Sequence, residues 1–174
     1  VRLTGFFKSG NNLEWNAGIG FQQDKTYKYG YEPQTLIFSP DSLRQNFQTI
    51  AGRLAFHNIN KTEFGLRYSP EVKINVFSDN HDNSESNTVV NLPLQKTIGK
   101  EFTVNLGVTF DLTRVSPKNK SAINNTMYFI SPSVLYKTSN INIEAGIRPS
   151  WDNRTFKMFP NILAAISSSD SRIT

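Results

Sequence analysis

Cysteine is absent from the 174-residue sequence, so no disulfide bond stabilises its fold. Long apolar runs are absent too, which excludes a membrane-spanning helix, because such a helix needs about 20 consecutive apolar residues. Without disulfides, the fold must be stabilised by its own backbone hydrogen bonds and packing. This holds for an envelope protein as much as for a cytosolic one, so the absence of cysteine leaves the compartment open.

Residues that carry catalysis or bind metals are scarce. The two histidines, His57 and His81, lie in different segments, and no Gly-x-Ser-x-Gly motif surrounds any serine. One oxygen-rich segment, with Asp79, Asn83 and Glu85, lacks the central glycine and the spacing of a calcium-binding loop, and we interpret it as a solvated surface loop. The sequence therefore predicts no enzyme, no metal site and no cofactor.

Concentrated positive charge is missing as well. The formal net charge is +5, but the 19 Lys and Arg residues are scattered singly along the chain. A nucleic-acid-binding protein usually gathers such residues on one surface or in a recognisable motif. We therefore expect no nucleic-acid partner.

What the sequence does contain is a repeated alternation of apolar and polar residues. From residue 13 to residue 22 every odd position is apolar and every even position is polar or glycine, which is the period of a β-strand with one apolar face. We predict about nine such strands from this pattern. They cover residues 2–8, 13–22, 47–57, 62–77, 88–97, 101–114, 127–137, 141–151 and 155–166.

The predicted connections alternate in length, which is typical of a transmembrane β-barrel with short turns at one end and long loops at the other. We therefore predict an all-β fold, an antiparallel transmembrane β-barrel. Residues 1–174 form part of this single domain, with further segments expected at one or both ends. The alternative is an antiparallel β-sandwich, whose strands usually have only about 5–6 residues. The short connections are 10–12, 58–61, 98–101 and 138–140, and the long ones are 23–46, 79–87 and 116–125.

Prolines and one capping motif refine this pattern. Five prolines lie within or beside the predicted strands, and we expect Pro70 and Pro132 to mark bulges or strand ends, because proline cannot donate a ladder hydrogen bond. Ser39 suits a helix N-cap and Pro40 suits the first helical position, so we predict one or two helical turns within residues 39–46.

Aromatic residues recur at a spacing that suits the two interfaces of a membrane. Phe102 and Phe110 lie on the same predicted face, eight residues apart. In a tilted strand this spacing corresponds to roughly 20 Å along the membrane normal, close to the height of the apolar band of a barrel. The candidates for these aromatic girdles are Trp15, Phe21, Phe102, Phe110, Tyr128 and Tyr136.

Charged residues alternate onto the polar faces of the same strands and are predicted to face the lumen. Either the basic ones give the lumen a positive potential that favours anionic solutes, or they pair with the acidic ones. A group of tyrosines in the longest loop, Tyr27, Tyr29 and Tyr31, suits contact with sugar or protein, or packs within the loop itself. The predicted lumen-facing residues are Arg53, Arg67, Glu71, Lys73, Asp111, Glu144 and Arg148.

The hairpin pattern along the whole chain, the asparagine-rich turns and residues 155–162, with Phe159, Pro160 and Asn161, give the sequence a family resemblance. It resembles outer-membrane β-barrels of the Bacteroidota, in particular those related to the barrel of TonB-dependent receptors. The resemblance implies location in the bacterial outer membrane, contact with the lipid bilayer and lipopolysaccharide, and nutrient uptake. It also implies possible assembly with other outer-membrane proteins or surface lipoproteins. Residues 1–174 contain no plug domain or TonB-box region of a receptor.

Two functional hypotheses follow. The first is a porin or a receptor-like barrel that transports solutes, with selectivity set by the lumen residues. The second is a non-enzymatic barrel that serves as a scaffold subunit in a multi-protein outer-membrane complex, with its loops as docking surfaces. Both need the same strands, so the sequence leaves the choice open.

Overall fold

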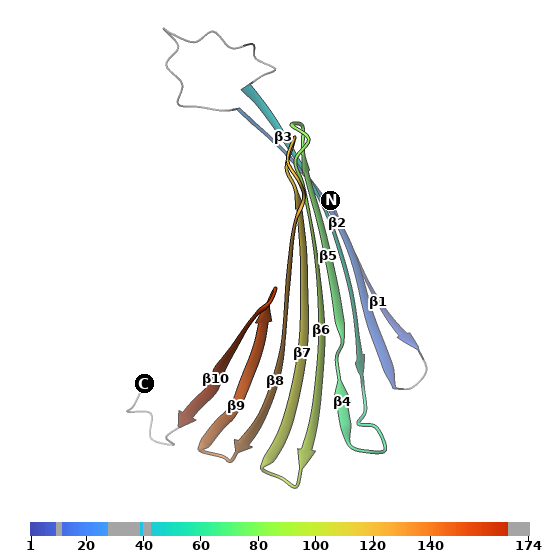
Figure 1. Cartoon of the computed structure of the whole chain (residues 1–174). Helices are drawn as coiled ribbons and strands as arrows, with labels where there is room; N and C mark the ends of the chain where they lie inside the picture. Colours follow the sequence, from blue (N-terminus) through green and yellow to red (C-terminus); the bar gives the residue numbers. More distant parts are fainter. Residues whose placement is uncertain (10–11, 28–38, 40–42, 167–174) are drawn as a thin grey trace, which may run out of the picture.

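The computed structural model describes residues 1–9, 12–27, 39 and 43–166, and these form one antiparallel sheet of ten strands (Figure 1). The sheet follows chain order, β1-β2-β3-β5-β6-β7-β8-β9-β10, while the short β4 pairs with β6. This confirms the predicted all-β antiparallel fold. The strands are β1 Arg2–Ser9, β2 Leu13–Tyr27, β3 Arg44–Asn58, β4 Leu66–Tyr68, β5 Glu71–Asp79, β6 Ser84–Ile98, β7 Phe102–Ser116, β8 Ile123–Lys137, β9 Ile141–Asp152 and β10 Thr155–Ile166.

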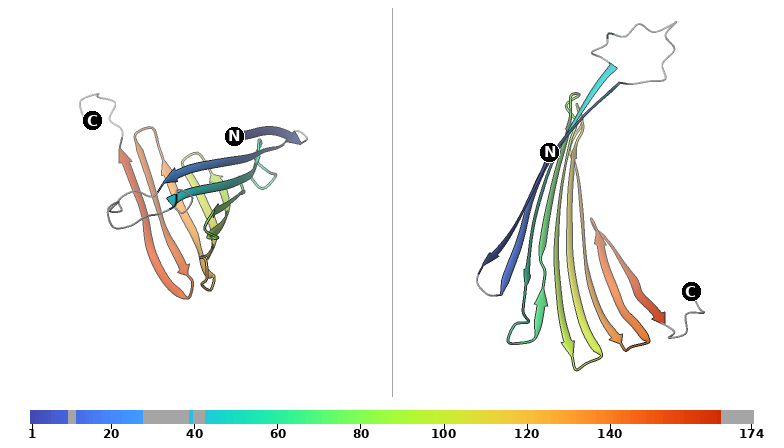
Figure 2. Two further views of the ribbon diagram at one scale, coloured as in Figure 1. Left: turned by 90° about the horizontal axis from the view of Figure 1, so that it is seen from above. Right: turned by 180° about the vertical axis from the view of Figure 1, so that it is seen from behind.

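The sheet is strongly curved and open. Seen from above, it bends into a trough with β1–β3 on one wall and β9–β10 on the other (Figure 2). Within the described residues β1 and β10 are the two edges and do not pair with each other. The structure thus establishes a curved sheet, whereas its closure into a barrel belongs to the proposal made below.

The prediction of one strand over residues 62–77 is wrong for residues 62–65, and the remainder is interrupted at Pro70, as predicted. Residues 62–65 form a turn, in which the Gly65 N–H donates to the Thr62 carbonyl at 2.8 Å and Gly65 takes a φ of +73°. The rest divides into β4 and β5 at Pro70. On the facing strand, the Pro93 carbonyl accepts from the Ser69 N–H at 3.2 Å. The missing N–H of Pro93 therefore lies opposite this break, and its absence interrupts pairing there and not with β7.

Pro132 also interrupts pairing, but not as a bulge. Between β8 and β9 the register is the same on both sides of the interruption, with Phe129 opposite Ser150 and Ser133 opposite Gly146. No extra residue is inserted, which a bulge requires. Pro132 and Pro149 lie on opposite strands within the unpaired stretch, and each removes one donor from the ladder there.

The strands are longer than predicted at the end that carries the long loops. β5 ends at Asp79 and β6 begins at Ser84, so the predicted loop 79–87 is mostly strand. The same extension shortens the loop 116–125 to residues 117–122, and residues 153–154 form a tight turn at this end. Polar residues continue a ladder as well as apolar ones, because the bonds are made by the backbone. The predicted alternation in loop length is therefore weaker than the sequence indicates.

The helical turns predicted for residues 39–46 include residues 40–42, which lie outside the described residues. Leu43 has a helical backbone, and β3 begins directly after it at Arg44. Residues 44–46 are thus strand, and the helical prediction is wrong for them. They pair with residues 25–27 of β2, which explains why they extend.

Candidate functional site

The candidate site is the sheet surface itself, because its two faces differ in chemistry and in exposure. Along β7, the side chains that alternate between the faces are apolar and exposed on one side, and polar or small and half-buried on the other. A depression lined by His57 of β3, Asn105 of β7 and Asn161 of β10 reaches from wall to wall of the trough. These three residues belong to the polar face, so the polar face is the concave one.

All seven predicted lumen-facing residues lie on this concave face. The register shows it directly: Arg53 pairs with Lys73, Lys73 with Val89 and Val89 with Asp111. On the remaining strands the register again identifies which residues point to the concave face. Each of the other predicted residues is one of these or lies an even number of positions from one of these along its own strand. The remaining four are Arg67 of β4, Glu71 of β5 and the pair Glu144 and Arg148 of β9.

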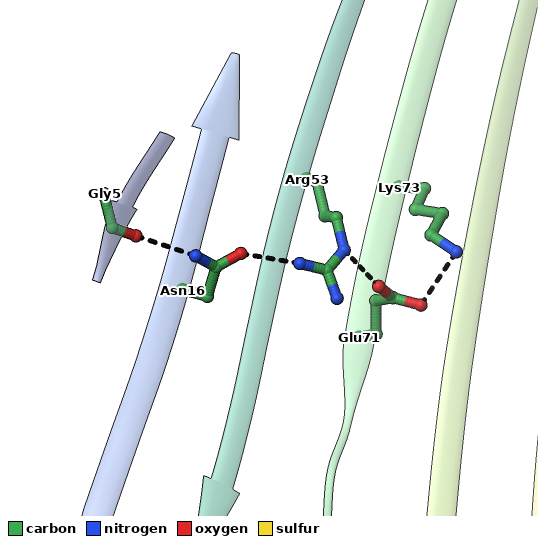
Figure 3. Close-up of polar contacts among 5 residues, drawn as sticks. All are labelled: Gly5, Asn16, Arg53, Glu71 and Lys73. Carbon is green, nitrogen blue, oxygen red and sulfur yellow. Dashed lines mark hydrogen bonds and ion pairs between the residues drawn. The ribbon is translucent and has the colours of Figure 1, made fainter. Parts of the chain in front are cut away.

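An ion-pair network crosses the concave face from β1 to β5 (Figure 3). The Glu71 carboxylate binds the Arg53 guanidinium through one oxygen and the Lys73 ammonium through the other, the latter at 3.0 Å. Arg53 also donates to the Asn16 side-chain oxygen at 2.6 Å, and Asn16 in turn donates to the Gly5 carbonyl at 2.9 Å. One carboxylate thus serves two cations, so the network retains a positive charge.

The other two acidic residues among the seven predicted ones are held by neutral donors. Asp111 accepts from the Asn87 side chain at 2.7 Å, and Glu144 accepts from the Ser133 hydroxyl at 2.6 Å. Pairing between the predicted basic and acidic residues therefore occurs at Glu71, but neither at Asp111 nor at Glu144 among the described residues. The sequence pattern placed these residues on one face, and only the register of distant strands shows which of them meet.

The convex face is apolar and has no second layer over it. The described residues contain no fully buried apolar side chain, so this sheet has no core of its own. Leu106 at the centre of β7 is 38% exposed, as much as residues nearer the ends of the strand. Such a large contiguous apolar surface marks contact with a membrane or with another protein.

The six predicted girdle residues all lie on the convex face, and they fall in two rows. Phe102 contacts Tyr136 with ring centroids 5.0 Å apart, near the turns at 99–101 and 138–140. Phe110 contacts Tyr128 at 6.2 Å, farther up the same two strands. Trp15 and Phe21 repeat this separation in part on β2.

The structure adds aromatic residues that the sequence pattern did not single out. Tyr128 stacks on Trp151 at 5.0 Å and Trp151 contacts Phe156 at 5.1 Å, which extends the upper row to the edge strand β10. At the opposite edge, Phe7 stacks on Trp15 at 4.3 Å. These partners come from different strands, so only the strand register reveals the rows.

Above the upper aromatic row the convex face becomes polar. On β2 Gln23 and Lys25 follow Phe21 on the convex face before the strand ends at Tyr27, and on β7 Arg114 follows Leu112. Asn124 occupies the matching position of β8. The apolar surface is therefore a band of limited height, not a face that is apolar along the whole strand.

Above this band, Asp79 closes the turn between β5 and β6. Its carboxylate accepts from the backbone N–H groups of His81 at 2.8 Å and Asn83 at 2.9 Å. Partial burial raises the pKa of the Asp79 carboxyl. The hydrogen bonds from Asn83 and His81 together lower it by more than burial raises it, so the pKa lies below its ordinary value. Asp79 thus serves as a turn cap, in keeping with a surface loop.

Three further features of the sequence were considered: metal ligands, membrane-spanning helices and the tyrosine group. Within the described residues there is no group of three or more potential metal ligands, and no helix there has the length and apolarity to cross a membrane. Tyr27 ends β2, while Tyr29 and Tyr31 lie outside the described residues.

Comparison of the chain with protein-family models gave no match, and neither curated proteins nor solved structures gave one.

Proposed function

We propose that this sheet is part of the wall of a transmembrane β-barrel in a bacterial outer membrane, and that the barrel transports solutes. The observation that carries the proposal is the inverted arrangement of the sheet, with an exposed apolar band on the convex face and polar side chains on the concave face. A water-soluble sheet buries its apolar face, whereas a barrel in a membrane turns it toward lipid.

The dimensions of the apolar band support a membrane. Phe102 and Phe110, which belong to the two aromatic rows, are eight residues apart. At ~3.3 Å per residue and a tilt of about 40°, they are separated by roughly 20 Å along the membrane normal. The apolar band of outer-membrane barrels is about 25 Å tall and is flanked by aromatic girdles.

The β-sandwich alternative fits these observations less well. A sandwich partner would cover the middle of the apolar face and leave no reason for aromatic rows at both of its borders. Its strands would also be short, about 5–6 residues, whereas β3, β6, β7 and β8 each have 15 residues. In the proposed barrel, the convex face contacts lipid acyl chains and lipopolysaccharide.

Transport is supported by the charge of the concave face. Among the seven predicted lumen-facing residues, the basic Arg53, Arg67, Lys73 and Arg148 outnumber the acidic Glu71, Asp111 and Glu144 by four to three. A lumen lined by such residues favours the entry of anions. We therefore expect the barrel to conduct, with a preference for anions.

Conductance across a planar lipid bilayer tests this function. The purified full-length protein should form anion-selective channels, and the double variant Arg67→Gln/Lys73→Gln should show a smaller anion preference. The matched control is Lys25→Gln, which removes one positive charge from the convex side above the apolar band and should leave selectivity unchanged. A protein that inserts but conducts nothing would refute the transport proposal.

A scaffold in an outer-membrane complex is the second candidate, and one observation favours it. The β2–β3 ribbon extends beyond the neighbouring strands, and its projecting part carries polar residues such as Thr26 and Gln45 (Figure 1). A projecting polar ribbon suits contact with a partner outside the membrane. A protein without conductance that remains bound to other outer-membrane proteins, and loses them when residues 23–27 and 45–48 are altered, would establish this alternative.

The orientation of the barrel is tested separately with single cysteines and a membrane-impermeant thiol label on intact cells. The chain has no native cysteine, so each introduced one is unique. We expect labelling at Asp82 and Lys118, whose turns contact each other through an ion pair of 3.0 Å, but not at Lys100 or Asn140. Labelling at the second pair alone would reverse the orientation.

A further inference from the structure

One part of the concave face brings aromatic and basic side chains close together. Across β8, β9 and β10 it forms a depression of about 510 Å³. Phe129 and Lys157 both lie opposite Ser150, and Phe159 lies opposite Arg148, so the four large side chains occupy adjacent positions. Elsewhere along β7 and β9 the concave positions carry small polar or charged residues.

The guanidinium of Arg148 lies over the ring of Phe129, with its central carbon 3.6 Å from the ring centroid. Stacking of this kind fixes the plane of the guanidinium and leaves its N–H groups at the edge free for another partner. Among the described residues, no carboxylate lies within 4.0 Å of Arg148 or of Lys157, and neither side chain donates a hydrogen bond. Both cations therefore face the depression unpaired.

This arrangement contrasts with the network around Glu71, where Arg53 and Lys73 are held by a carboxylate. The acidic residue that lines the depression is Asp152, which lies four positions along β9 from Arg148 and accepts from the Asn153 side chain at 3.1 Å. At ~3.3 Å per residue this separation is about 13 Å. Asp152 would therefore repel a second negative charge at the far end of a ligand without neutralising Arg148.

We propose that this depression binds an organic monoanion with a flat apolar body, such as an aromatic carboxylate. The edge of Arg148 and the ammonium of Lys157 would bind the carboxylate by charge-assisted hydrogen bonds. Phe159, which is 47% exposed, would stack on the ring of the ligand. The volume lies within the range of small-molecule sites, about 300–1,000 Å³. The inference deepens the proposed function, on which it rests for the role of the site in the path of a solute.

Binding is tested by calorimetric titration of the detergent-solubilised full-length protein with 2-naphthoate, with empty micelles as the blank. The neutral 2-naphthalenemethanol is the matched ligand without charge. We expect 2-naphthoate to bind and the alcohol to bind at least about tenfold more weakly, because a charge-assisted bond contributes about 1.5–3 kcal/mol. Equal binding of the two ligands would overturn the proposal, as would the absence of binding by 2-naphthoate.

Variants localise the site. Arg148→Gln should weaken 2-naphthoate binding by about tenfold or more, whereas Arg67→Gln, the same change elsewhere on the concave face, should leave it unchanged. Phe159→Leu, at a half-exposed position, should weaken binding several-fold, and far-UV circular dichroism verifies the fold of each variant. Equal losses in Arg148→Gln and Arg67→Gln would show a general attraction of anions and overturn the site.

The two proposals fail separately. Because binding is measured in detergent, a protein that binds 2-naphthoate but conducts nothing refutes transport and leaves the site standing. A protein that conducts but does not distinguish 2-naphthoate from its alcohol refutes the site and leaves transport standing.

Discussion

The convex and concave faces of the sheet are built from the same strands but differ in the chemistry and the contacts of their side chains. On the convex face, neighbouring positions are interchangeable in chemistry: Val104, Leu106 and Val108 all present apolar surface and make no specific polar contact. On the concave face several side chains have particular partners, as the Asn16–Arg53–Glu71 contacts show. The difference supports the proposal that the convex face meets lipid acyl chains, a medium without fixed structure, and that the concave face determines what the protein binds or admits.

The largest expected effect tests this difference directly. Leu106→Arg should lower the free energy of unfolding in lipid vesicles by about 2–4 kcal/mol, because a charge near the bilayer midplane loses its hydration. Its neighbour Asn105→Arg, on the concave face, should cost much less. Urea titration of both variants measures the contrast, and a larger loss for Asn105→Arg would show that the faces are assigned the wrong way round.

The next effect tests how closely the concave face is packed. A Cβ atom at Gly146 would lie 2.4 Å from the Pro132 carbonyl oxygen and 2.9 Å from the Ser133 Cα, both backbone atoms that cannot easily move. Gly146→Ala should therefore cost about 1–3 kcal/mol. Gly107→Ala is the control, because its nearest neighbour would be the Ser131 Cβ at 3.7 Å. Equal urea midpoints for the two variants would contradict the close approach of β8 and β9.

The third change, in the ion-pair network of the concave face, should have a smaller effect on stability but a clear effect on ion selectivity. Glu71→Gln removes the carboxylate shared by Arg53 and Lys73, whose side chains are 43% and 46% exposed. Since solvent screens such exposed cations, the loss in unfolding free energy should be about 1 kcal/mol or less. The anion preference of the channel should rise, because two cations lose their counter-ion. An unchanged reversal potential in bilayers would show that this network does not face the conducting path.

The smallest effect lies outside both faces, at the turn after β5. Asp79→Ala removes the acceptor for two backbone N–H groups and should cost about 0.5–1 kcal/mol. Because the pKa of Asp79 is lowered in the folded protein, its contribution is present above the ordinary pKa of an aspartate and is lost as the pH falls through the folded value. Wild type and variant should therefore differ in stability at pH 7 and converge in acid. A difference that persists at pH 2 would assign the effect to something other than the carboxylate.

Features that depend only on the alternation of residues along one strand could be predicted from the sequence. The period of two in residues 13–22 and 102–112 predicts both the strands and the separation of residues between the two faces, and β2 and β7 have this arrangement. Pro70 also interrupts a strand as predicted, because the effect of a missing N–H is local.

Features that depend on pairing between distant strands could not be predicted in the same way. The bond between Arg53 and Asn16 joins residues 37 positions apart, and the register that aligns them is set by the whole β2–β3 ladder. The polar segments at 84–87 and 123–125 carry no alternation, yet they extend β6 and β8 because their backbones pair. Strand β10 has apolar residues on both faces, and Phe159 acquires a distinct role only beside Arg148 and Phe129.

The order of the strands along the chain has a consequence for how the protein folds. Since most neighbours in the sheet are neighbours in sequence, the sheet can grow one hairpin at a time, and the entropy lost at each closure is small. The longest connection is that of residues 28–43 between β2 and β3, about four times as long as the turn at 80–83. Its closure costs about 1.2 kcal/mol more, at ~0.6 kcal/mol for each doubling of length. We therefore expect the ladder from β5 to β9 to form first and the β1–β2 hairpin to join it late, so that amide hydrogens of β1 and β2 become protected last in a refolding experiment.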